Sequence, residues 1–301
     1  MEVLFSQGPT AHNRLANSLL WMSRAYPALS QKPEHHFVFP WGREVLADYL
    51  DPVSPWLLDK AALAPGLFSG VTGHELTAVN LANFSRELQH LHEQQHNLDP
   101  YDWERLMLMV TINGISISYN VGQGLNFAEV FEKALGVDLL IVHEPYQVNF
   151  EGAPLPDYGL EHIAPAACLL DESRCYVETI NPRDFPLCAL HVRRGDYSIW
   201  EGGRFFFDDH FWLELCRRLM GEGFQVCIFT NDQEGALCEA LISLGAHVSQ
   251  GSASQDFCRM LHVDKIIGPP STFPIMARSL AKACLNRSIV YETLQPIKKN
   301  S

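Results

Sequence analysis

Two arginines, an aspartate and a tyrosine stand directly after an apolar run, in residues 191–197 (HVRRGDY). The apolar run indicates a buried strand, so the charged side chains fall at the carboxyl end of that strand. A guanidinium presents a planar fork of N–H donors that fits the oxygens of a phosphate group. The segment is therefore a candidate diphosphate site. An Arg–Asp ion pair at a domain boundary is the alternative interpretation.

A second candidate anion site is the segment of residues 268–273 (GPPSTF), which follows another apolar run and opens a predicted helix. Hydroxyl and free backbone N–H groups at a helix N-terminus favour an anion. Helix capping by Ser271 or Thr272 explains the same residues equally well. Neither segment has the lysine of a GxxxxGKS/T pattern, so a P-loop nucleotidase is not supported.

Two aspartates occupy positions where α/β folds commonly bind nucleosides. Asp256 stands at the start of a predicted helix, and Asp232 follows the apolar residues 225–230. Capping of the helix that follows is the alternative for both.

The elements that must position these residues alternate regularly after residue 187. Helices are expected at residues 209–220, 233–244, 255–262 and 273–283, and strands at residues 187–192, 225–230, 247–249, 265–268 and 288–291. Such alternation is typical of a parallel, doubly wound sheet. Ligands of these sheets bind at the carboxyl ends of the strands, so both candidate anion sites are expected at one edge.

The N-terminal half is less regular. It opens with a predicted strand at residues 2–6, and a strand is also predicted at 139–142. The helices predicted there cover residues 13–24, 73–92, 100–110 and 127–135. Residues 145–185 lose periodicity and gain Pro and Gly, so we place the interdomain connection there. The 301 residues then form two Rossmann-like domains, 1–165 and 166–301, facing a cleft.

The composition excludes several classes of protein. The formal net charge of -13 disfavours a partner that is nucleic acid. No run of about 18 apolar residues and no basic leader is present, so we expect a cytoplasmic protein with at most peripheral membrane contact. The eight cysteines form no CxxC, which favours reduced core thiols over disulfides or zinc. His90, His92 and His96 have no nearby carboxylate or cysteine pair to complete a metal site, so no metal is expected.

The HVRRGDY segment resembles the HxRRxDY signature of the fucosyltransferase superfamily, which includes alpha-1,2- and alpha-1,6-fucosyltransferases and, more distantly, protein O-fucosyltransferases. An N-terminal strand and a loop with His12-Asn13-Arg14 precede it, and an acidic residue and an STF-type motif follow. Residues 202–206 (GGRFF) are similar to a string of bacterial members. The resemblance covers about residues 187–291, and in the N-terminal half only about residues 2–26. The usual Gly-rich first loop is replaced, which leaves the linkage and acceptor open.

The resemblance implies a GT-B fold, GDP-fucose as the donor, and a metal-independent, inverting transfer to a glycan or glycolipid acceptor without a cofactor. Arg193 would hold the β-phosphate, His191 would approach the diphosphate or ribose, and Asp256 the guanosine. Ser271 and Thr272 would complete the phosphate cradle. The remaining donor-site residues on this basis are Arg194, Phe273, Asn13 and Arg14.

Asp196 is the first candidate for the general base, which must lie within about 3 Å of the acceptor hydroxyl or reach it through one water. His12 and Glu144 are weaker candidates from the facing half. Asp196 could equally hold Arg194 in place. Another nucleotide sugar as donor, and a non-catalytic nucleotide or glycan binder, remain the alternative functions.

Overall fold

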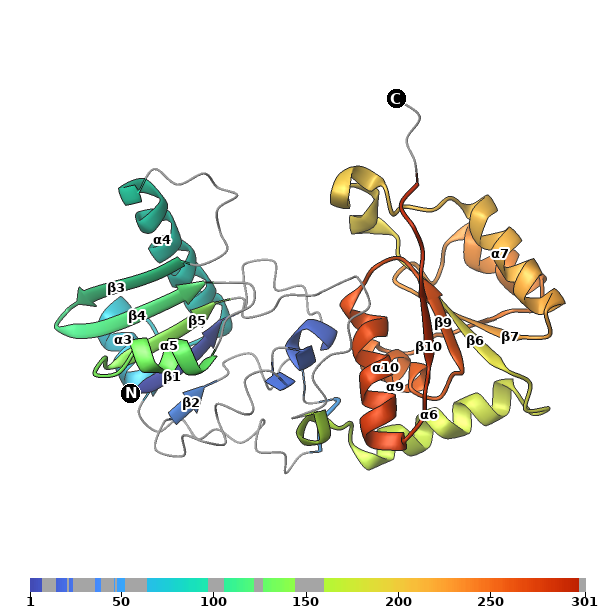
Figure 1. The fold of residues 1–301 in the computed structure, drawn as a ribbon, viewed down its shortest axis with the longest axis horizontal. Helices are drawn as coiled ribbons and strands as arrows, with labels where there is room; N and C mark the ends of the chain where they lie inside the picture. Colours follow the sequence, from blue (N-terminus) through green and yellow to red (C-terminus); the bar gives the residue numbers. More distant parts are fainter. Residues whose placement is uncertain are drawn as a thin grey trace. The chain divides into compact units, whose positions relative to one another are not determined.

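The computed structural model describes residues 1–6, 15–20, 22–23, 36–38, 46, 48–51, 64–96, 106–121, 127–143 and 160–297. The chain divides into two compact units, Met1–Asn149 and Phe150–Ser301, and each holds a five-stranded sheet. The predicted α/β class is confirmed (Figure 1). The division lies before the predicted boundary at residue 165, because the short helix η2 (Leu160–Ile163) packs against α10 (Thr272–Leu285). The cleft between the domains stays a prediction.

The sheet of the first unit has the order β2-β1-β5-β4-β3. Its strands are β1 (Glu2–Ser6), β2 (His36–Val38), β3 (Leu106–Ile112), β4 (Ile115–Val121) and β5 (Leu139–His143). The described helices of this unit include α3 (Ala64–Thr72), α4 (Ala78–His96) and α5 (Phe127–Lys133). Phe68 of α3 and Leu81 of α4 are fully buried against Ile117 and Tyr119 of β4. The strands predicted at residues 2–6 and 139–142 are confirmed.

The helix predicted at residues 100–110 is wrong for its described part, because β3 forms an antiparallel hairpin with β4. The two strands are joined at Asn113 and Gly114, whose φ angles are 51° and 80°. Two successive residues in the left-handed region are the mark of a tight hairpin turn, for which Asn-Gly is a preferred sequence. The apolar run alone does not separate a helix from a strand, whereas this Asn-Gly pair would have done so.

The second unit holds an entirely parallel sheet with the order β10-β9-β6-β7-β8. Its strands are β6 (Leu187–Val192), β7 (Gln225–Thr230), β8 (His247–Val248), β9 (Lys265–Gly268) and β10 (Val290–Thr293). The first strand therefore lies in the centre, and the chain winds outward first on one side and then on the other. This is the order of a Rossmann-like half, and it confirms the predicted doubly wound sheet.

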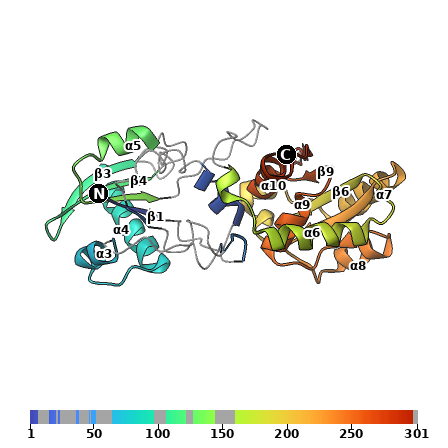
Figure 2. The ribbon, with the colours of Figure 1, turned by 90° about the horizontal axis from the view of Figure 1, so that it is seen from below.

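Helices cover both faces of this sheet (Figures 1 and 2). The helices α7 (Asp209–Gly221) and α8 (Ala236–Ser243) pack on one face, and α6 (Ala167–Ile180), α9 (Ala253–Met260) and α10 form the layer on the other. Alternate residues of a strand point to opposite faces. Leu190 and Val192 of β6 therefore join the α7 side, while His191 stacks on Phe273 of α10.

The helix α6 corrects the prediction that residues 145–185 form an irregular connection. Residues 144–159 lie outside the described part of the chain, but the C-terminal portion of the segment is helical. Leu169 and Ser173, one turn apart, are the buried positions of α6. The stretch between Pro165 and Pro182 contains neither Gly nor Pro, and this feature indicates a helix.

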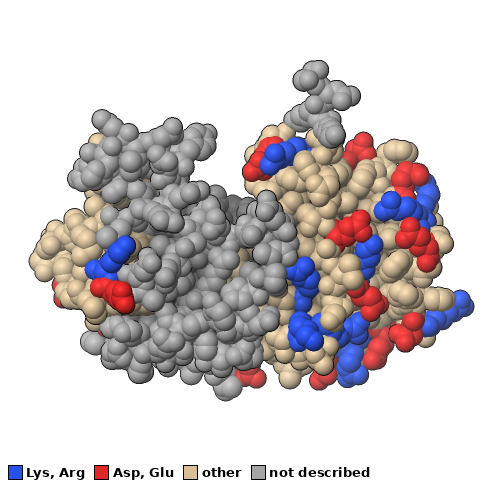
Figure 3. All heavy atoms as spheres, viewed as in Figure 1, with Lys and Arg blue, Asp and Glu red and all other residues tan. Residues whose placement is uncertain are grey.

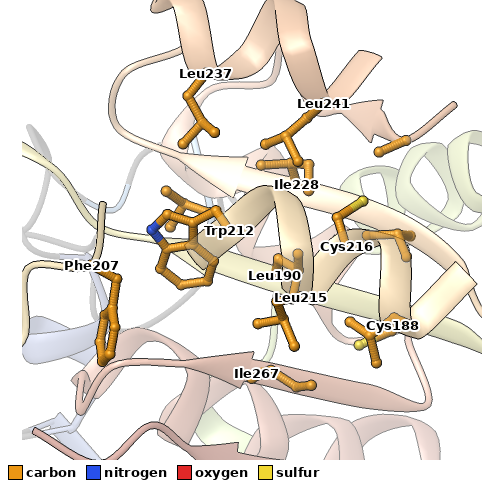
Figure 4. Close-up of a cluster of buried hydrophobic side chains, with 14 residues drawn as sticks. Cys188, Leu190, Phe207, Trp212, Leu215, Cys216, Ile228, Leu237, Leu241 and Ile267 are labelled. Atoms are coloured by element: carbon orange, nitrogen blue, oxygen red, sulfur yellow. The ribbon is translucent and has the colours of Figure 1, made fainter. Parts of the chain in front are cut away.

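The core of the second unit centres on Trp212 of α7, which is fully buried (Figure 4). Leu237 and Leu241 of α8 point toward it from above, and Leu190 and Ile228 of the sheet complete the contact layer. The α7 helix begins after Asp208, whose carboxylate accepts a hydrogen bond of 2.8 Å from the Phe211 N–H. This cap fixes where the helix starts and hence how Trp212 enters the core.

All eight cysteines are free, which agrees with the predicted reduced thiols. Burial raises the pKa of Cys188 and Cys227 to about 12, so both are protonated at neutral pH. Cys168 and Cys175 are exposed on α6 and do not belong to the core, contrary to the expectation. No helix in the described ranges is both long and apolar enough to cross a membrane. On the face of the second unit in Figure 3, acidic and basic side chains are interspersed.

Candidate functional site

The carboxyl edge of the second sheet carries a cavity of about 540 Å³. It lies at the ends of β6 and β7, and on its other side β6 is the neighbour of β9, where the connections from the strands leave in opposite directions. Such a switch point is where open α/β sheets bind their ligands. The cavity is lined by residues that follow β6, β7 and β8 and by the first turns of α9 and α10. Lining residues include His191, Arg193, Asn231, Asp232, Asp256 and Phe273.

His191 is a buried wall of this cavity, with its ring stacked on Phe273 at 5.7 Å between centroids. Burial, and to a smaller degree the Arg193 guanidinium, lowers the pKa of His191 to about 3, so the imidazole is neutral at neutral pH. Its Nδ1 atom is buried and has no hydrogen-bond partner among the described residues. A buried polar atom without a partner is costly, and a bound ligand would satisfy it.

Arg193 is held in place by Asp196, because Arg193 Nη2 donates to both carboxylate oxygens at 2.9 Å. The guanidinium also lies 5.2 Å from the centre of the Tyr197 ring. Arg193 Nε is buried without a partner among the described residues. The side chain is therefore fixed on one edge while it lines the cavity.

Arg194 makes its contacts near the start of α7. Its guanidinium is bonded to the Asp209 carboxylate and to the Phe207 carbonyl, the latter at 3.1 Å, and its side chain is only 12% exposed. The interpretation that Asp196 holds Arg194 is wrong, since Asp196 pairs with Arg193. Arg194 lies outside the cavity lining because its donors are used to join β6 to the start of α7. Its contact with a donor stays a prediction.

The loop after β9 is fixed by two tyrosines. Tyr291 of β10 donates to the Pro269 carbonyl at 2.9 Å, and Tyr197 donates to the Pro270 carbonyl. Ser271 caps α10 and accepts from the Phe273 N–H at 3.4 Å, so the capping interpretation holds for Ser271. Thr272 opens the helix, and phosphate contacts of these residues stay predictions. The Tyr197 bond joins this loop to the HVRRGDY segment.

Gly268 is the point of closest approach between β9 and β6. A Cβ atom at this position would meet the His191 carbonyl oxygen at 2.8 Å and His191 Cβ at 2.9 Å. We expect Gly268→Ala to lower the free energy of unfolding by about 1–3 kcal/mol, because the two strands must move apart. Gly221→Ala is the control, since a Cβ there has no neighbour within 4 Å. Urea denaturation compares them, and an unchanged midpoint for Gly268→Ala would contradict the close packing.

Asp256 lines the cavity from the first turn of α9, but it does not cap that helix. Ser252 is the cap, in a capping box with Gln255, so the capping interpretation of Asp256 is wrong. Asp256 Oδ1 accepts from Ser249 Oγ at 2.6 Å and from Arg259 Nη1 at 3.4 Å. Burial raises the pKa of Asp256 to about 6 despite these donors.

Asp232 also lines the cavity and is not a cap, because Gly235 is the N-cap residue of α8. Its backbone N–H donates to Thr230 Oγ1 at 3.1 Å. The carboxylate lies so close to Gly235 that a Cβ there would meet Oδ2 at 2.6 Å. The structure thus brings two carboxylates, those of Asp232 and Asp256, to the cavity that Arg193 also lines.

Arg259 contacts a residue of the cavity lining, and the sequence patterns did not single it out. It is 8% exposed and contacts Asp256 one turn earlier on α9. An acidic and a basic residue at i and i+3, flanked by Phe257, Cys258 and Met260, was the available signal, because charges among apolar residues need a partner.

The remaining expected residues lie outside the described part of the chain: His12, Asn13, Arg14 and Glu144. Their roles stay predictions. Within the described ranges, no group of three or more His, Cys, Asp or Glu side chains is placed to hold a metal ion.

Comparisons with known proteins give similarity in solved structures only. No protein-family model matches the chain. No curated protein sequence matches it either. The chain is similar to the NodZ alpha-1,6-fucosyltransferase co-crystallized with GDP, with 11% identity, 92% of this chain and 91% of that chain covered, and a TM-score of 0.47. NodZ from Bradyrhizobium in a second structure gives 12% identity, the same coverage and a TM-score of 0.46.

POFUT1 in complex with GDP is similar at 8% identity, with 97% of each chain covered and a TM-score of 0.44. POFUT1 in complex with GDP-fucose matches over 55% of this chain and 58% of that chain, with 10% identity and a TM-score of 0.38. The fold class stated above rests on the strand order of the chain itself.

Proposed function

We propose that this chain is a glycosyltransferase that moves L-fucose from GDP-fucose to a hydroxyl of a glycan or glycolipid acceptor in the cytoplasm, with inversion and without a metal. The observation that carries the proposal is a pair of buried atoms, His191 Nδ1 and Arg193 Nε, which have no hydrogen-bond partner in the described part of the chain and belong to residues that line one cavity. Both belong to the segment that resembles the HxRRxDY signature. Buried polar atoms without partners indicate a ligand that supplies the missing hydrogen bonds.

The cavity has a basic and an acidic part, which suits a nucleoside diphosphate. Arg193 and the N-terminus of α10 favour the diphosphate, while Asp232 and Asp256 suit hydroxyl and N–H donors of the nucleoside. A volume of about 540 Å³ lies within the usual range of small-molecule sites, about 300–1,000 Å³. The neutral imidazole of His191 offers either a donor or an acceptor between these two parts.

The reaction needs charge stabilisation at the leaving group. The acceptor oxygen forms a bond to C1 of fucose, the bond from C1 to the β-phosphate oxygen breaks, and its electron pair leaves on GDP. Negative charge grows on the β-phosphate as the sugar becomes oxocarbenium-like. Arg193, preset by Asp196, is the residue that would stabilise this charge, with hydroxyl and N–H groups of residues 271–273 beside it.

The acceptor hydroxyl must lose its proton to a base or to water. Asp196 remains our first candidate, and its side chain is 37% exposed. Its two hydrogen bonds from Arg193 support an equal interpretation, in which Asp196 orients the arginine and a residue of the other unit takes the proton. Asp196→Asn separates these roles, because Asn keeps one acceptor for Arg193 but cannot take a proton.

Nucleotide binding tests the donor. In calorimetric titration we expect GDP to bind more tightly than UDP, CDP or ADP, with equal affinity in magnesium and in EDTA. The reason is the carboxylate at the base end and the guanidinium at the phosphate end. Preference for another nucleotide would mean that the donor is a sugar linked to that nucleotide. GDP binding without transfer of fucose to any acceptor would favour a non-catalytic binder instead.

A further inference from the structure

Asp256 belongs to a buried network that reaches behind the cavity. Arg259 Nη1 donates to Asp256 Oδ1 at 3.4 Å and to Ser249 Oγ at 2.9 Å. Arg259 Nη2 donates to Glu172 Oε1 of α6 at 3.4 Å. The side chains of Asp256 and Arg259 are each only 10% exposed, and Arg259 is not part of the cavity lining. Arg259 therefore stands behind the aspartate rather than in contact with a ligand.

The network has close neighbours on α6 and at Gly251. The Arg259 guanidinium lies 4.0 Å from the centre of the Tyr176 ring, and Gln255 Nε2 holds Glu172 at 2.7 Å. A Cβ atom on Gly251 would meet both Arg259 Nη1 and Asp256 Oδ1 at 2.5 Å. Only glycine fits there without displacing the two charged groups. The direction of the Asp256 carboxylate is thus set by its surroundings.

We propose that Arg259 is a positioning residue of the nucleotide site. Together with Glu172 and Ser249 it fixes the Asp256 carboxylate at the cavity, and so sets the preference for a base whose edge presents adjacent N–H donors, as guanine does. This inference rests on the proposed donor. A carboxylate can accept hydrogen bonds from two adjacent N–H groups only when it is ionised and points toward both of them.

The groups facing Asp256 come from several elements. Arg259 lies on its own helix, Ser249 and Gly251 precede that helix, and Cys227 lies on β7. Glu172 and Tyr176 of α6 contact Arg259. Burial is the main cause that raises the pKa of Asp256, and Ser249 and Arg259 oppose it. Removing the Arg259 charge therefore raises this pKa further and reduces the ionised fraction at neutral pH.

The test is Arg259→Met in the full chain, titrated with GDP and with inorganic pyrophosphate. We expect the Kd for GDP to rise about 10- to 100-fold, as for loss of a hydrogen bond to a charged group, while the Kd for pyrophosphate is unchanged. Arg259→Lys should restore part of the GDP affinity. Arg174→Met is the matched control, because Arg174 is 55% exposed on α6 and its ion-pair partners among the described residues are exposed carboxylates.

The pH dependence adds a readout that a purely structural role would not move. For the wild type, GDP affinity should fall as the pH drops through about 6, because Asp256 takes up a proton. In Arg259→Met the pH at which half of the GDP affinity is lost moves to a higher value. If Arg259→Met does not fold, Arg259→Lys carries the same comparison with a smaller loss of GDP affinity, because Lys keeps the charge but not the planar fork.

Equal weakening of GDP and pyrophosphate binding, or an unchanged pH midpoint, would overturn the positioning role and leave the proposed donor intact. A wild type that binds pyrophosphate as tightly as GDP would instead overturn the proposed donor. The two failures are therefore distinguishable.

Discussion

Arg193→Ala should lower kcat/KM for fucose transfer about 100- to 1,000-fold or more, because the variant loses the guanidinium that faces the growing charge on the leaving GDP. The fold should be unaffected. The Arg193–Asp196 pair joins side chains that are 25% and 37% exposed and lie three residues apart, and such pairs contribute little to stability. Single-turnover assays give the rate, and thermal unfolding monitors the fold.

Two further variants sharpen this experiment. Arg193→Lys keeps the charge but not the planar fork, so an intermediate loss of rate is expected. Arg174→Ala removes an arginine of equal charge from an exposed position of α6 and should transfer fucose at the normal rate. A near-normal rate for Arg193→Ala would refute the phosphate role of this residue.

Trp212→Ala should lower the free energy of unfolding by about 3–5 kcal/mol, the largest effect on stability that we expect. The ring is fully buried between α7, α8 and the sheet, so its removal leaves a large cavity in the cluster (Figure 4). Its Nε1 atom is buried without a partner in the described part of the chain, so the loss comes from packing and not from a hydrogen bond. Urea denaturation of the full chain measures it.

Trp212→Phe provides the matched comparison. Phe keeps a smaller aromatic ring in the core and removes an unsatisfied N–H. We therefore expect the free energy of unfolding to fall by less than about 1.5 kcal/mol. Ile242→Ala on the outer side of α8 should change stability by less than about 0.5 kcal/mol, since that side chain is 53% exposed. A cost for Trp212→Ala no larger than that of Ile242→Ala would mean that this cluster does not form the core.

The sequence by itself determined the second sheet and the edge that carries the cavity. Apolar runs and helical periods over residues 187–291 are local signals, and β6, β7 and β9 lie where these signals predict them. Residues at the ends of parallel strands must share an edge, so His191 and Arg193 could be predicted to lie near the loop after Gly268. The Asn113-Gly114 turn is an equally local signal, but the helix prediction for residues 100–110 did not use it.

Only the tertiary structure decided which charges pair. Arg193 and Arg194 are adjacent and chemically alike, yet one meets Asp196 and the cavity, and the other meets Asp209 at the start of α7. The choice depends on the direction in which each side chain leaves the strand end, and no local pattern contains it. The same holds for Arg259, whose partner Glu172 is 87 residues away in the chain. Burial makes such partners necessary, and packing alone selects them.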